Sequence, residues 1–87
     1  MYNFSEIFDA FTISKQEAVI NYSLANILME TFKKVNIALD HEAIMTIVYD
    51  YSHSTYDIST LPYAITEEEQ SRIALRTAVA KHIKLSG

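Results

Sequence analysis

The chain contains no cysteine, and it has only one glycine and one proline among its 87 residues. Without cysteine it cannot form disulfides, thiolate nucleophiles or cysteine-based zinc sites. The single glycine is the last residue, so the glycine-rich loops that hold phosphates, dinucleotides or oxyanions are excluded as well. So few helix breakers favour helices over a turn-rich all-β fold.

The composition, 49% hydrophobic and 21% charged, is that of a folded chain. A chain of this length forms one domain, and we expect a single domain over residues 1–87. The net charge of −4 gives no positive field for general attraction to nucleic acid or membranes, so a basic or neutral partner is favoured. No run of about 18 apolar residues and no secretory signal are present, so we expect a cytoplasmic protein without membrane contact.

The first part of the chain predicts a short helix followed by a long one. Phenylalanine and isoleucine recur at helical spacing after a possible N-cap at Asn3 or Ser5. Ser14 and Glu17 then have the spacing of a capping box, which predicts that a new helix begins there and runs to about Val35.

This long helix has two adjacent apolar faces, more than four short helices of one chain are expected to cover. We therefore expect a homodimer, the commonest symmetric assembly. The candidate interface residues are large and apolar: Phe4, Phe8, Tyr22, Met29 and Phe32.

Residues 43–51 could be helix or strand. Asp40 is placed to cap a helix, yet the segment is rich in β-branched and aromatic residues, which favour strands. We favour a medium helix, because the sequence offers no partner strand. Residues 52–65 contain the only proline and lack periodicity, so they are expected to form a long loop.

Thr66 and Glu69 form a second capping box, and a final helix is expected to run to about Lys84. The predicted fold class is thus all-α: a compact four-helix domain with a short helix, a long central helix, a medium helix, a loop and a C-terminal helix.

Catalytic chemistry is not indicated. His41 lacks the second histidine of a helical zinc motif, and Ser52-His53-Ser54 are neighbours in sequence without being a triad. We expect no enzyme, no metal and no cofactor. A metal-dependent or other small enzyme built from His41, His53 and carboxylates remains a third, weaker hypothesis.

The segment from Tyr49 to Tyr63 holds four of the six tyrosines. Tyrosine and serine with a few acids are typical of adaptable binding surfaces. The predicted partner-binding residues are His53, Tyr56 and Asp57. The favoured function is therefore protein–protein interaction by a regulator, inhibitor or adaptor of a larger complex, of a kind common in bacteria and phages.

The alternative is a small DNA-associated transcriptional regulator. Residues 67–87 carry three acids against four bases, whereas residues 1–66 carry eight against three. The acids at 67–69 would repel DNA phosphates at the start of the helix, where a recognition helix contacts the bases. DNA contact is therefore expected only through the later, basic part of the helix. Its candidate nucleic-acid contacts are Arg72, Arg76, Lys81 and Lys84.

Overall fold

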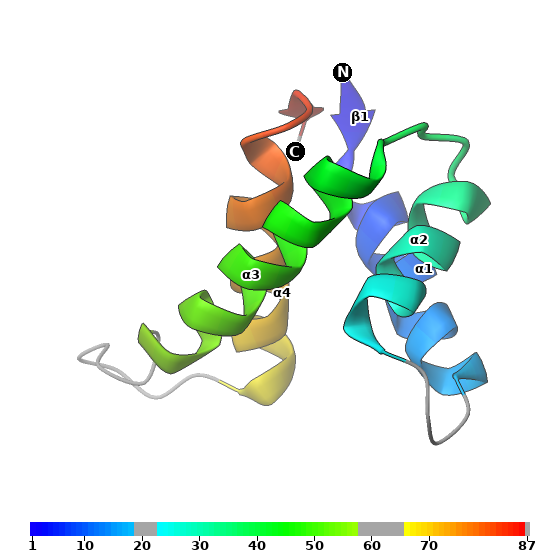
Figure 1. Ribbon diagram of the computed structural model, residues 1–87. Helices are drawn as coiled ribbons and strands as arrows, with labels where there is room; N and C mark the ends of the chain where they lie inside the picture. The colour runs from blue at the N-terminus through cyan, green and yellow to red at the C-terminus, as the bar shows by residue number, and fades with distance from the viewer. Residues whose placement is uncertain (19–22, 58–65, 87) are drawn as a thin grey trace.

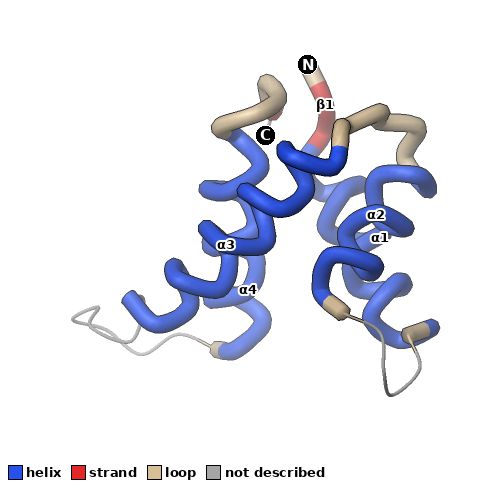
Figure 2. The backbone as a smooth tube through the Cα atoms, in the orientation of Figure 1, coloured by secondary structure: helices blue, strands red, loops and turns tan. Residues whose placement is uncertain are grey.

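The computed structural model describes residues 1–18, 23–57 and 66–86, and within them the chain forms four helices (Figures 1 and 2). The helices are α1 (Phe4–Glu17), α2 (Leu24–Lys34), α3 (His41–Asp57) and α4 (Glu67–Ala80). The predicted all-α four-helix fold class is confirmed. No helix in the described part is long and apolar enough to cross a membrane.

The core forms around the phenylalanines of α1. Their spacing puts them on one face of the helix, where they meet side chains from all three other helices. Each large side chain buried in this way contributes about 1.5–3 kcal/mol of transfer free energy. The main core residues are Phe4, Ile7, Phe8, Phe11, Leu28, Phe32, Ile37, Ile44, Ile47, Leu75, Ala78 and Val79.

Three helix starts are capped as the sequence predicts. Asn3 Oδ1 accepts a hydrogen bond from the Ser5 amide at 2.9 Å, and Asp40 Oδ1 accepts one from the Ala43 amide at 2.8 Å. Thr66 Oγ1 likewise accepts from the amide three residues later, at 3.1 Å. These bonds satisfy amides that a helix leaves free at its first turn. Residues 43–51, left open between helix and strand, are helical.

The predicted long helix over residues 15–35 is wrong. Helix α1 continues through Ser14 to Glu17, and α2 starts at Leu24 with Ser23 as its cap, whose Oγ accepts from the Asn26 amide at 3.2 Å. Ser14 lies three residues after Phe11, on the same buried face of α1, and its side chain is only 4% exposed. Because the buried face of α1 includes Ser14, the helix continues through the predicted capping box to Glu17.

Two other boundaries also differ from the prediction. Helix α3 extends to Asp57, so residues 52–57 belong to a helix and not to the expected loop. Helix α4 ends at Ala80 instead of near Lys84. The chain then forms β2 (Leu85–Ser86), which pairs in parallel with β1 (Tyr2–Asn3) and brings the two ends of the chain together (Figure 1).

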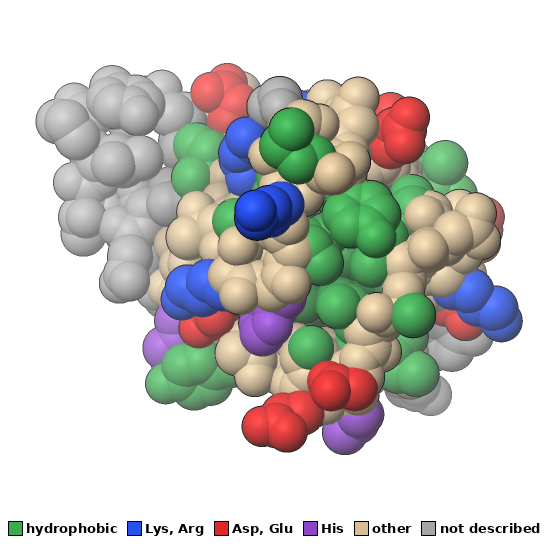
Figure 3. Space-filling view, turned by 90° about the horizontal axis from the view of Figure 1, so that it is seen from above, with side chains coloured by type: hydrophobic (Ala, Val, Ile, Leu, Met, Phe, Trp, Pro, Cys, Tyr) green, Lys and Arg blue, Asp and Glu red, His purple; other side chains and the backbone are tan. Residues whose placement is uncertain are grey.

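The helices pack mainly as two pairs, α1 with α2 and α3 with α4. Seen from the end that carries both termini, hydrophobic side chains gather between the surrounding polar and charged groups (Figure 3). Helix α3 contributes Ile44 and Ile47 to the core. Its opposite side is exposed and holds the candidate site.

Candidate functional site

Five exposed residues on one side of α3 form a surface that we call the outer face of α3. It consists of Glu42, Met45, Thr46, Tyr49 and His53, which recur at helical spacing opposite the buried isoleucines. The Tyr49 side chain is 61% exposed and that of Met45 is 44% exposed. Large apolar side chains that gather on one exposed side are typical of contact surfaces.

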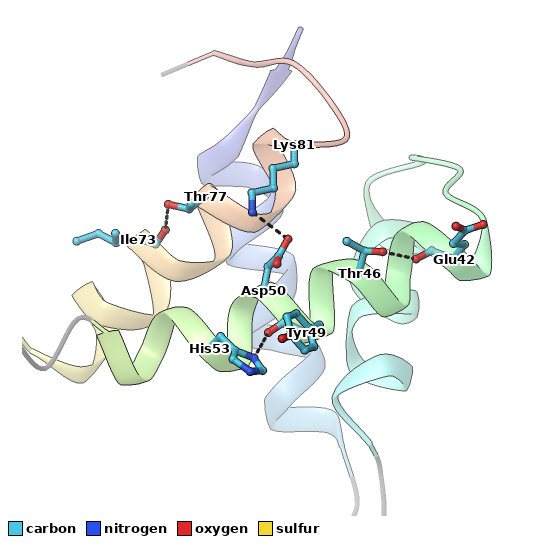
Figure 4. A network of polar contacts seen from close by, with 8 residues as sticks. All are labelled: Glu42, Thr46, Tyr49, Asp50, His53, Ile73, Thr77 and Lys81. Carbon is cyan, nitrogen blue, oxygen red and sulfur yellow. Dashed lines mark hydrogen bonds and ion pairs between the residues drawn. The ribbon is translucent and has the colours of Figure 1, made fainter.

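Tyr49 and His53 form one stacked unit on this face (Figure 4). Their ring centroids are 3.9 Å apart and the ring planes differ by 26°. His53 Nδ1 lies 2.9 Å from the Tyr49 carbonyl oxygen, to which it can donate a hydrogen bond. Because each ring restrains the other, the pair presents contact area with little rotamer entropy left to lose on binding.

An ion pair joins α3 to the residue that ends α4 beside this face. Lys81 Nζ of α4's C-terminal end lies 3.2 Å from Asp50 Oδ2, as Figure 4 shows. An exposed ion pair of this kind contributes little to stability. Its consequence for the site is that one lysine of the predicted basic group is engaged with an acid of the same chain.

The three predicted partner-binding residues have different outcomes. His53 is exposed on the outer face of α3. Tyr56 and Asp57 are the last two residues of α3, and their side chains lie outside the described part of the structure. Neither outcome tests binding itself, so the contact role of all three remains a prediction.

The predicted dimer-interface residues are mostly core residues. Phe4, Phe8 and Phe32 are at most 5% exposed and pack within the chain itself, so they are not surface candidates for a dimer interface. The reason is that α1 and α2 are separate helices that cover each other. Met29 is exposed, and Tyr22 lies outside the described residues.

Two of the predicted nucleic-acid contacts are turned toward α1. The Arg72 guanidinium lies 5.2 Å from the Phe4 ring centroid and 5.3 Å from that of Phe8. It also donates to Ser5 Oγ at 3.1 Å. Arg76 lies 5.6 Å from the Phe4 ring. Both arginines are half-buried, and their stems and charges cover the aromatic start of α1.

The other two predicted contacts, Lys81 and Lys84, are exposed, and Lys81 makes the ion pair with Asp50. The four basic residues therefore do not project together as a free basic stripe. This arrangement gives no support to a DNA-reading role for α4.

A cleft of about 570 Å³ opens between α1, α3 and the start of α4. Within it the Tyr51 hydroxyl and Ser71 Oγ share a hydrogen bond. The described residues contain no group of three or more histidines and acids that could hold a metal ion. The cleft is mixed in charge, and its lining residues are Phe8, Thr12, Lys15, Tyr51, Glu67, Glu68, Gln70 and Ser71.

The sequence interpretation missed Met45 and Tyr49 as surface residues. The available signal was the helical period: once residues 43–57 are read as a single helix, positions 45, 49 and 53 fall opposite Ile44 and Ile47. Treating residues 52–65 as loop hid this continuation. Comparison of the chain with protein-family models, curated proteins and solved structures finds no match.

Proposed function

We propose that this chain is a small cytoplasmic protein that acts by protein–protein contact, as a regulator, inhibitor or adaptor of a larger complex. The contact surface is the outer face of α3. A homodimer is also part of the proposal, although the phenylalanines first assigned to its interface are buried within the chain.

The observation that carries the proposal is the exposed Tyr49–His53 stack beside Met45. Tyrosine is enriched among the residues that dominate binding energy at interfaces, and a ring already fixed by a neighbour loses less entropy on binding. The face lies on the longest described helix, at residues 41–57. A regular helix holds its side chains at fixed spacing, and a partner can recognise that spacing.

Affinity capture tests this proposal. The tagged full chain is used to capture proteins from the native cell, and the captured set is quantified by mass spectrometry. The Tyr49→Ala/His53→Ala double variant should recover specific partners at least about tenfold less well, since loss of one dominant tyrosine commonly costs 2 kcal/mol or more.

The matched control is Asn26→Ala, which shortens an exposed polar side chain on α2. It should capture the same set as the unmodified chain. The thermal unfolding midpoints of the unmodified chain and both variants are measured first. Equal midpoints exclude a folding defect as the cause of lost capture. Equal capture by the double variant and the unmodified chain would refute the outer face of α3 as the contact surface.

A further inference from the structure

The cleft of about 570 Å³ is formed by one side of α1, by Tyr51 of α3 and by the first turns of α4. Its α1 residues, Phe8, Thr12 and Lys15, recur at helical spacing and therefore share one side of that helix. The volume lies within the range of about 300–1,000 Å³ that is typical of small-molecule pockets. None of the lining residues belongs to the outer face of α3, so the cleft is separate from the proposed contact surface.

Aromatic rings form the inner part of the cleft and hold its lysine. Phe8 is 5% exposed and Tyr51 is half-buried, so both rings reach the cleft from the side of the core. The Phe11 ring meets that of Tyr51 edge-on, with the centroids 5.7 Å apart. Lys15 Nζ lies 4.7 Å from the Phe11 ring centroid. The lysine charge is therefore held beside an aromatic surface that can receive an apolar group.

The α4 part of the cleft is acidic, because Glu67 and Glu68 begin that helix. Within the described part of the chain, neither glutamate forms an ion pair, and Lys15 forms none either. Opposite charges thus line one cleft without pairing directly with each other. A ligand that carries both charges would pair with both. An ammonium group has three N–H donors, so it can donate to two carboxylates at once.

We propose that this cleft binds a free α-amino acid with a large apolar side chain. The ammonium group of the ligand donates to Glu67 and Glu68, and its carboxylate accepts from Lys15. Its side chain lies against the rings of Phe8 and Tyr51. A simple organic cation would face the like charge of the lysine, and a simple anion would face two like charges. The inference goes beyond the proposed function, because it assigns a ligand to a different surface.

An NMR titration of the ¹⁵N-labelled full chain tests the class of ligand. The probes are L-phenylalanine, phenethylamine, which lacks the carboxylate, and 3-phenylpropionate, which lacks the amine. L-Phenylalanine should give saturable shifts of the backbone amides in residues 8–15 and 67–71. Each analogue should bind about tenfold more weakly, because each loses a charge-assisted contact.

Charge-removing variants assign the contacts. Lys15→Gln should weaken L-phenylalanine binding about tenfold without weakening phenethylamine binding, because the amine analogue has no group for the lysine to bind. Glu67→Gln/Glu68→Gln should weaken L-phenylalanine binding at least as much without weakening the binding of 3-phenylpropionate. The controls Lys33→Gln and Glu30→Gln remove the same charges from exposed positions on α2 and should leave all three affinities unchanged. A loss confined to particular probes cannot result from misfolding.

Absence of saturable shifts at the cleft would overturn this inference. Binding of either analogue as tight as that of L-phenylalanine would also overturn it, because a site for a single charge would then be sufficient. An equal loss of all three probes in the charge variants would contradict the assigned contacts and overturn it as well. The Tyr49→Ala/His53→Ala variant should bind L-phenylalanine normally, so failure of the cleft and failure of the proposed contact surface are measured separately.

Discussion

Replacing Ser14 with alanine should stabilise this protein. The Ser14 side chain is 4% exposed in the interior of α1, and its hydroxyl has no hydrogen-bond partner among the described protein groups. A buried hydroxyl without a partner costs about 1–3 kcal/mol in mutational studies. Alanine also favours helix over serine by about 0.5 kcal/mol. We expect a net gain of about 1–2 kcal/mol in the free energy of unfolding.

The assay is urea unfolding followed by circular dichroism, with an unchanged m-value as evidence that only stability has moved. Thermal unfolding should show a midpoint about 4–8 °C higher for each kcal/mol gained. Ser23→Ala is the matched control, because Ser23 caps α2. Loss of that cap should cost about 1 kcal/mol.

The two serines thus give opposite signs for the same substitution. If Ser14→Ala destabilised the protein by about 1 kcal/mol, as loss of an N-cap does, the continuous helix α1 would be refuted. The capping box predicted from the sequence would then be right.

Three further predictions concern the packing of the helices. Phe32→Ala should cost about 3–5 kcal/mol in urea unfolding, because it opens a cavity in the core; a cost below 1 kcal/mol would mean that the side chain is not enclosed. Tyr51→Phe should cost about 1 kcal/mol by the same assay, because it removes the hydrogen bond to Ser71; no loss would show that the bond does not form in solution. Lys81→Ala should change stability by less than about 1 kcal/mol, and the change should shrink as salt rises, because the lysine of its pair with Asp50 is 58% exposed to solvent; a large, salt-independent loss would contradict this.

The elements that the sequence could predict are those with both a cap and a continuous apolar period. Thr66 combines an acidic first turn with a following apolar face, and α4 begins there. In the same way, the cap at Asp40 favoured helix over strand for residues 43–51, and these residues are helical. Local sequence signals were sufficient to predict these helix starts because packing of the core favours the same starts.

The boundary near Ser14 failed because two signals conflicted and the tertiary one prevailed. The Ser14–Glu17 spacing fits a capping box, but the same serine continues the core face of α1. Core packing commonly overrides a local preference of about 1 kcal/mol. That boundary also placed Phe32 on an exposed face of the merged helix, whereas in the structure α1 and α2 are separate and Phe32 is buried in the core.

The continuation of α3 past residue 51 changes what His53 can do. In a loop, its side chain and backbone would both have to be ordered on binding, at about 1–2 kcal/mol for each backbone residue fixed. In a helix, the backbone is already ordered in the folded protein, so binding does not have to order it. The stack with Tyr49 restrains the imidazole ring as well. The residue chosen from the sequence for its composition is therefore more favourably placed for contact than the loop hypothesis implied. Its effective neighbours are Tyr49 and Met45, one and two turns earlier, so substitutions at 45, 49 and 53 should act together on binding and not add independently.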